Sequence, residues 1–168
     1  MNVIEKNHRV YVGIGSNINQ VEHIKSCIKS LNKEFIDLEL SPTYESSSMG
    51  FDGPNFYNLV ATFRTNHDVV ELKRILNAIE RDNGRSLGEV KFSSRTLDID
   101  ILYYDELVDV QKNIPRSEIV KFDFVLRPLH DLCPAHIHPI TQKTHHTMIN
   151  DTAYEKMIIN QIDINYEC

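Results

Sequence analysis

The chain has 168 residues, of which 41% are hydrophobic and 25% charged, and its formal net charge is -6 at pH 7. This composition is typical of one globular domain and excludes a disordered or fibrous chain. The acidic balance argues against a nucleic-acid partner, because sequence-independent binding to phosphate backbones needs a basic surface. No apolar run approaches the roughly 18 residues of a membrane span, and the polar N-terminus does not resemble a signal peptide.

The three cysteines, Cys27, Cys133 and Cys168, show no paired spacing. Such cysteines are typical of free thiols in a reducing compartment. Together with the absence of a signal peptide and a membrane span, they predict a cytoplasmic protein. We also expect a monomer with a single domain over residues 1–168 and a histidine-rich tail of unclear role after about residue 145.

Alternating hydrophobic residues predict strands, and apolar residues at helical spacing predict helices. The predicted elements are a strand at 10–15, a helix at 20–33 with Asn19 as its N-cap, a strand at 34–44, a loop at 45–54, a strand at 56–64, a helix from Asp68 to Gly84, a basic loop at 83–95 and a strand at 96–104. This order predicts an α+β ferredoxin-like sandwich: a mainly antiparallel sheet with helices packed on one face.

Asp98 and Asp100 lie two residues apart in the last predicted strand. Because side chains alternate along a strand, both carboxylates face the same way, with Cα atoms about 6.5–7 Å apart, while Leu97, Ile99 and Ile101 face a core. Paired carboxylates repel each other and favour a cation, and Mg²⁺ is typically held by one or two carboxylates together with substrate phosphates. The alternative is an exposed polar strand face.

Four cations, Arg81, Arg85, Lys91 and Arg95, lie in and before the loop that leads to this strand. Cations beside paired carboxylates suit a polyphosphate ligand, although a solvated loop is an equal alternative. The chain lacks the glycine-rich GxxxxGK[ST] loop, so a P-loop enzyme is excluded.

An aromatic residue and an amide, Phe56 and Asn58, share one face of the strand at 56–64. Together they can stack on a flat heterocycle and hydrogen-bond its edge, and Phe124 could supply a second stacking face. A plain core role is the alternative for these aromatics. The histidines lack the spacing of a zinc site, which favours surface or structural roles for them.

Residues 11–17 (YVGIGSN), 53–58 (GPNFYN), 94–102 (SRTLDIDIL) and 124–129 (FVLRPL) follow one another along the chain. This combination resembles the hydroxymethyl-dihydropterin pyrophosphokinases, folate-pathway enzymes that transfer pyrophosphate from ATP to a pterin alcohol. The resemblance runs from about residue 10 to 140 and implies the same ferredoxin-like fold.

The resemblance also implies roles for matching positions. Asp98 and Asp100 would hold two Mg²⁺ ions, with Asp100 also placed to act as a base toward the pterin hydroxyl, and Arg85 and Arg95 would neutralise triphosphate charge during catalysis. The implied pterin-binding residues are Ser46, Ser47, Met49, Phe56, Asn58 and Phe124. The implied ATP-binding residues are Asn77, Glu80, Arg85, Lys91, Arg95, Arg116 and Lys121.

The chain departs from the family pattern at several positions. Arg116 replaces a phosphate-facing histidine and Phe122 replaces an arginine. Leu87, Phe92 and Ser93-Ser94 stand where the family usually has an arginine, a tryptophan and Gly-Pro. Three hypotheses follow: an active Mg²⁺-dependent pyrophosphokinase, a non-catalytic paralogue that binds a pterin or nucleotide, and a related kinase acting on a modified pterin.

Overall fold

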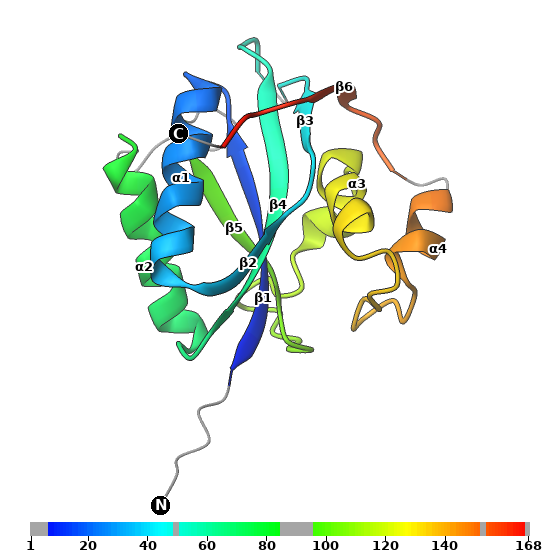
Figure 1. The fold of residues 1–168 in the computed structure, drawn as a ribbon. Helices are drawn as coiled ribbons and strands as arrows, with labels where there is room; N and C mark the ends of the chain where they lie inside the picture. The colour runs from blue at the N-terminus through cyan, green and yellow to red at the C-terminus, as the bar shows by residue number, and fades with distance from the viewer. Residues whose placement is uncertain (1–6, 49–50, 85–95, 152–153, 167–168) are drawn as a thin grey trace, which may run out of the picture.

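The computed structural model describes residues 7–48, 51–84, 96–151 and 154–166. Its elements in chain order are β1 (His8–Ser16), α1 (Gln20–Glu34), β2 (Ile36–Leu40), β3 (Thr43–Ser46), β4 (Phe56–Thr65), α2 (Val69–Asp82), β5 (Asp98–Tyr104), the 3₁₀ helix η1 (Ser117–Val120), α3 (Asp123–Leu132), α4 (His145–Asn150) and β6 (Ile158–Ile162). The sheet lies at the centre, with α1 and α2 on one side and α3 and α4 on the other (Figure 1).

The six strands of the described residues form one antiparallel sheet. Five of them follow the order β5-β1-β4-β3-β6, and the sixth, β2, pairs with the C-terminal half of β4. In strand β1, Gly15 pairs with Asp98 of β5 on one side and with Asn58 of β4 on the other. Asn58 in turn pairs with Tyr44 of β3. One row across the sheet therefore links the predicted metal ligand to the predicted pterin ligand through a glycine.

Each face of the sheet has its own hydrophobic core. Ile14 and Leu59 pack under α1 and α2 with residues such as Leu76, whereas Val60 and Leu102 pack under α3. The predicted α+β antiparallel fold is confirmed. The expectation of helices on one face only is wrong, because the second face also carries apolar side chains, and α3 covers them.

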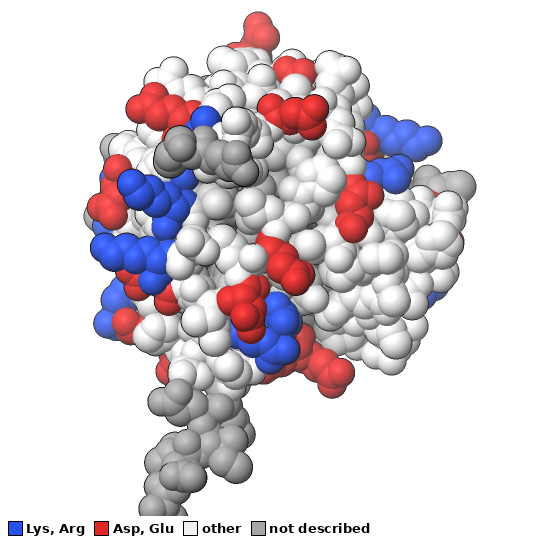
Figure 2. Space-filling view, viewed as in Figure 1, with Lys and Arg blue, Asp and Glu red and all other residues white. Residues whose placement is uncertain are grey.

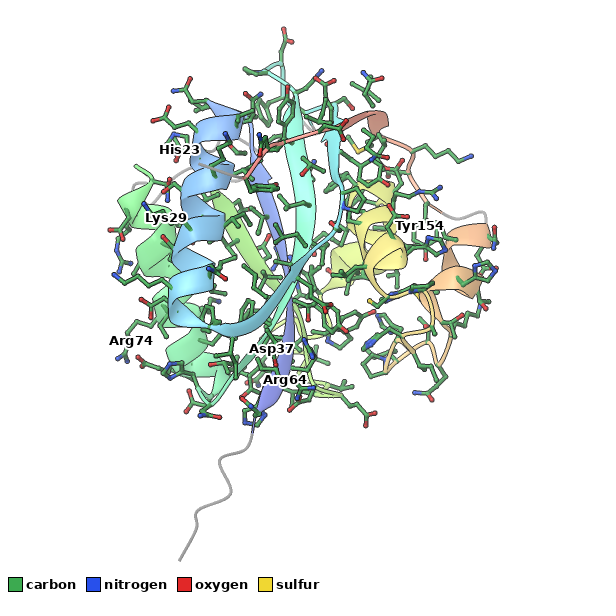
Figure 3. All side chains as sticks on the ribbon, in the orientation of Figure 1. His23, Lys29, Asp37, Arg64, Arg74 and Tyr154 are labelled. Carbon is green, nitrogen blue, oxygen red and sulfur yellow. The ribbon has the colours of Figure 1, made fainter. Side chains whose placement is uncertain are left out.

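The predicted strand at 34–44 is two strands, β2 and β3, which are separated at Ser41 and Pro42. Pro42 has no N–H to continue a ladder. Ser41 instead pairs with Val60: its N–H donates to the Val60 carbonyl at 2.9 Å and its hydroxyl accepts from the Val60 N–H at 2.8 Å. β2 is irregular at Asp37, which has a positive φ of 56° and an ion pair to Arg64 at 3.6 Å (Figure 3).

Two local predictions changed in detail. Asn19 does occupy the N-cap position of α1, but it is in the left-handed conformation and its side chain makes no capping hydrogen bond. Asp68 caps α2 as expected, accepting from the Glu71 N–H at 2.8 Å. The loop predicted at 45–54 begins later, because Glu45 and Ser46 belong to β3.

The histidine-rich region packs onto the sheet through α4. His145 and Met148 of this helix are buried, as is His138 in the preceding loop. The structural role predicted for histidines is therefore confirmed for His138 and His145. After α4 the chain crosses the end of β3 as β6, and beyond it Ile164 and Tyr166 pack against the core under α1 and α2.

Within the described ranges, no helix combines the length and the apolar composition needed to cross a bilayer. Cys27 is buried and Cys133 partly buried, and both are free thiols. On the face seen in Figure 2, most basic side chains lie with acidic ones on the side of α1 and α2, whereas the side of α3 and α4 is largely uncharged.

Candidate active site

Asp98 and Asp100 lie on β5, at the edge of the sheet. They pair with Gly15 and Gly13 of β1, and a Cβ on these glycines would meet Asn58 at position 15 and Leu102 at position 13. The intervening Ile99 is buried in the opposite core, as are Leu97 and, in part, Ile101, so the predicted alternation is confirmed. The two carboxylates therefore share the face of the sheet that α3 covers farther along.

Asp100 is in an unfavourable environment for a carboxylate. Burial, followed by the charge of Asp98, raises its pKa from an ordinary acidic value to about 8, and the Arg116 guanidinium only partly opposes this. Arg116 Nη2 lies 3.5 Å from Asp100 Oδ2 and donates to Glu118 Oε1 at 3.1 Å. A pair of crowded carboxylates with a shared, incomplete counterion favours an added cation.

A cavity of about 550 Å³ runs along β5. It is bounded by α2, by Asp98 and Asp100, and by the segment that ends at Arg116. The charged and amide side chains that line it are Lys73, Arg74, Asn77, Glu80, Arg81, Asp98, Asp100, Gln111, Lys112 and Arg116. A cavity with carboxylates at one wall and cations around it suits a polyphosphate carrying a divalent cation.

Glu80 connects α2 to the edge strand. It is buried, and its Oε2 accepts a hydrogen bond from the Ile99 N–H at 3.0 Å. That N–H lies between the two aspartates in the chain, so Glu80 fixes the position of the strand that presents them. Asn77, one turn earlier on α2, is exposed and lines the same cavity.

Three cations that line the cavity were missed from the sequence: Lys73, Arg74 and Lys112. A signal was present for Lys73, because residues 73, 77 and 81 are four apart and share one face of a helix. Figure 3 shows Arg74 on the outer side of α2, where it also forms an ion pair with Glu71 at 3.0 Å. Lys112 lies in an irregular segment, where periodicity carries no information.

A second group of predicted residues lies two strands away on the same face. The Asn58 side-chain amide donates to the Ser46 hydroxyl at 2.7 Å, and Ser46 is buried. A Cβ placed on Gly15 would lie 3.1 Å from Asn58 Oδ1 and 3.8 Å from Phe56 Cδ1. Asn58 and Phe56 thus lie beside Gly15, with Asp98 on the other side of the same glycine.

Phe124 lies in the first turn of α3, above the sheet face that carries Phe56 and Asn58. Its ring stacks on Phe122 with centroids 5.1 Å apart, and the Phe56 ring meets Phe51 at 6.4 Å. Among the described rings, no contact joins Phe56 to Phe124.

The remaining predicted residues fall into two sets. Ser47 donates its backbone N–H to the Met157 carbonyl at 3.2 Å, and Lys121 is exposed at the end of η1, outside the cavity lining. Met49, Arg85, Lys91 and Arg95 lie outside the described residues, as do Leu87, Phe92, Ser93 and Ser94.

Residues 11–134 match the family model for 7,8-dihydro-6-hydroxymethylpterin-pyrophosphokinase (HPPK). The chain belongs to this family. It is 36% identical over 139 residues to the 2-amino-4-hydroxy-6-hydroxymethyldihydropteridine pyrophosphokinase of Aquifex aeolicus, an alignment that covers 80% of this chain and 86% of the relative. The corresponding enzyme of Pseudomonas aeruginosa is 37% identical over 132 residues, covering 75% of this chain and 81% of the relative.

Longer proteins also match. The folic acid synthesis protein fol1 of Schizosaccharomyces pombe is 35% identical over 144 residues, which cover 82% of this chain but only 20% of that protein. The solved HPPK-DHPS structure of Plasmodium falciparum, the A437G form with SDX-DHP, superimposes with a TM-score of 0.69 at 13% identity over 87% of this chain and 45% of that one. The latter similarity supports the fold. As an HPPK, the chain is a pyrophosphokinase, a transferase.

Proposed function

We propose that this chain transfers the pyrophosphoryl group of ATP to the hydroxymethyl oxygen of 6-hydroxymethyl-7,8-dihydropterin in folate biosynthesis. The bond between that oxygen and the β-phosphorus forms as the bond from the β-phosphorus to the oxygen bridging it to the α-phosphorus breaks. AMP leaves with the bridging oxygen, and the hydroxyl proton is released. The observation that carries the proposal is the row Asp98–Gly15–Asn58, which places the carboxylate pair between a cation-lined cavity and the proposed pterin residues.

Asp98 and Asp100 fit Mg²⁺ as its protein ligands. Their oxygens are hard donors, and burial, followed by the charge of Asp98, raises the pKa of Asp100, an effect that a bound cation would oppose. The described residues contain no group of three or more His, Cys, Asp or Glu side chains that could hold a metal by themselves. This suits Mg²⁺ bound jointly with phosphate oxygens, and we propose two ions. When bound, Mg²⁺ would neutralise phosphate charge as the β-phosphorus is attacked.

The chain's own residues supply positioning and charge. Arg116 and Lys112 lie at one end of the cavity and Lys73 and Arg81 along α2, where they would neutralise the triphosphate together with the proposed Arg85, Lys91 and Arg95. Asp100 would also accept the pterin hydroxyl proton, because as a ligand of the metal it would lie closest to both the metal and the substrate.

The pterin would lie on the opposite side of β1 from β5. Asn58, whose amide orientation is set by Ser46, would hydrogen-bond the edge of the ring. Phe56 and Phe124 would cover its two faces, with Ser47 and Met49 at the rim. The departures at Arg116, Phe122 and Leu87 motivate the non-catalytic alternative, but the cavity and the carboxylate pair favour neither it nor the modified-pterin alternative. We further propose a monomer in the cytoplasm.

A coupled assay of AMP release tests the function. With the dihydropterin alcohol, ATP and Mg²⁺ we expect steady AMP formation that stops when the pterin is omitted or the metal is chelated. AMP formation independent of the pterin, or binding of both substrates without turnover, would contradict the proposal and favour the binding-only alternative.

A further inference from the structure

Asp123, the first residue of α3, binds the C-terminal segment of the chain. Its Oδ1 accepts from the Met157 N–H at 2.8 Å and its Oδ2 accepts from the Ile158 N–H at 3.2 Å. Its own N–H donates to the Glu155 carbonyl at 3.1 Å. One aspartate therefore connects the start of α3 to residues 155–158 through three hydrogen bonds, two of them to its carboxylate.

The same segment is also bound to β3. Ile158 pairs with Ser46, and the Ser47 N–H donates to the Met157 carbonyl. Residues 155–158 thus lie between the end of β3 and the start of α3, where the chain passes from α4 toward α1 (Figure 1).

The two elements joined in this way carry opposite parts of the proposed pterin site. Ser46 orients Asn58 on the sheet side, and Phe124 follows Asp123 directly in the chain. The far end of α3 has a separate connection to β3, a hydrogen bond from the Tyr44 hydroxyl to Asp131. Residues 155–158 therefore control the distance between α3 and β3 at the end where Phe124 lies.

We propose that Asp123 is a positioning residue for pterin binding: through residues 155–158 it fixes Phe124 relative to Ser46 and Ser47. This inference rests on the proposed function. None of the three connected elements lines the cavity beside β5. Loss of the Asp123 carboxylate should therefore weaken binding of the pterin and leave binding of ATP unchanged.

The test compares Asp123→Ala and the milder Asp123→Asn with the control Asp105→Asn. The Asp105 carboxylate also accepts a backbone hydrogen bond from a distant segment, from the Arg9 N–H at 2.8 Å. Asp105 directly follows β5 and binds the start of β1, so its bond does not involve α3 or β3. Its positive φ of 48° suits asparagine. We expect Asp123→Ala to raise the pterin KM about tenfold, because removing charge-assisted hydrogen bonds has an effect of about this size. The pterin KM of Asp123→Asn should lie between those of Asp123→Ala and the parent. All three variants should keep the ATP KM within about twofold of the parent value.

Hydrogen exchange provides a readout that does not depend on activity. The amides of Ser47, Met157 and Ile158 should exchange faster in both Asp123 variants and remain unchanged in Asp105→Asn. If Asp123→Ala does not fold, Asp123→Asn decides. An unchanged pterin KM, or an equal rise in both KM values, would overturn the proposal. Absence of turnover in the parent protein would instead overturn the proposed function, and direct titration with the pterin would then compare the same variants.

Discussion

Arg116 forms an ion pair with Glu118 at 3.1 Å and lies slightly farther, at 3.5 Å, from Asp100. The guanidinium therefore lies between the carboxylate pair and a third acid, Glu118. It is partly exposed, so a phosphate entering the cavity can reach it. This geometry supports a phosphate contact for the arginine that replaces the family histidine.

Replacing Arg116 by alanine should raise the apparent ATP constant about tenfold or more. A charge-assisted hydrogen bond to phosphate contributes roughly 1.5–3 kcal/mol, and tenfold corresponds to about 1.4 kcal/mol. Steady-state kinetics with varied ATP measure this effect. Lys121→Ala is the matched control, because Lys121 is an exposed cation nearby that does not line the cavity. An ATP constant that stays at the parent value in Arg116→Ala would remove this residue from the phosphate site.

Replacing Asp100 by asparagine should abolish most activity and yet stabilise the metal-free protein above neutral pH. The pKa of Asp100 is raised on folding, so the folded state binds its proton more tightly than the unfolded state between about pH 4 and pH 8. The free energy of unfolding of the parent therefore falls as pH rises through this window. Asparagine carries no charge and removes that loss.

Thermal melts of Asp100→Asn and the parent in a chelating buffer at pH 5 and pH 8 measure the effect. We expect a higher melting temperature for the variant at pH 8 and a smaller difference at pH 5. The gain is moderated by solvent screening, because the side chain is about one-third exposed, and 1 kcal/mol corresponds to about 2–4 °C in a domain of this size. A variant that melts lower than the parent at pH 8, or one that keeps parental turnover, would contradict the assignment of Asp100.

Replacing Gly15 by alanine should weaken pterin binding more than the same change at Gly13. The new Cβ at 15 would lie 3.1 Å from Asn58 Oδ1, which is tighter than an ordinary contact, so Asn58 must shift. At 13 the nearest atom is Leu102 Cδ2 at 3.5 Å, an ordinary van der Waals distance. We expect a pterin KM raised about three- to tenfold in Gly15→Ala and within twofold in Gly13→Ala, by analogy with a weakened hydrogen bond of about 1 kcal/mol. Equal effects of the two alanines on the pterin KM would mean that Asn58 does not hydrogen-bond the pterin.

Local patterns predicted much of this fold and site. The alternation around Asp98 and Asp100 placed both carboxylates on one face, and the same reasoning placed Phe56 with Asn58, because a strand has a strict period of two residues. The order of strands and helices was enough for the fold class. These predictions depend only on neighbouring residues.

Other features depend on contacts between distant segments, and the sequence did not reveal them. Nothing near Asp123 indicates that its carboxylate accepts from residues more than thirty positions later. Glu80 matched an ATP-binding position by resemblance, yet its carboxylate also accepts from the Ile99 backbone. The sequence predicted a polar tail for the histidine-rich region. Its residues are buried by packing on Tyr103 and the sheet, and a periodic pattern in the local sequence does not reveal such contacts.

His145 provides the last prediction, because its imidazole is fully buried and has a partner at each nitrogen. Nδ1 lies 2.9 Å from the Cys133 carbonyl oxygen, which can only accept, so Nδ1 carries the proton and donates. Nε2 is then the acceptor for the Tyr103 hydroxyl at 2.8 Å. The neutral ring thus satisfies both contacts, and burial lowers its pKa to about 4. Burial also lowers the pKa values of the neighbouring His136 and His138.

The folded protein should therefore lose stability in mild acid, with His145 as a main contributor. The unfolded chain binds a proton at this residue near pH 6.5 and the folded chain only near pH 4, so the free energy of unfolding falls as pH drops through that window. With about 1.4 kcal/mol for each pKa unit, the loss in the free energy of unfolding from pH 7 to pH 4 is on the order of 3 kcal/mol.

His145→Asn keeps a donor for the Cys133 carbonyl but cannot titrate. Its melting temperature should be lower than the parent's at pH 7 and should change less with pH between 7 and 4.5. His146→Asn, at the exposed next position of α4, should keep the parent's pH dependence. A parental slope in His145→Asn would show that the acid sensitivity comes from other groups.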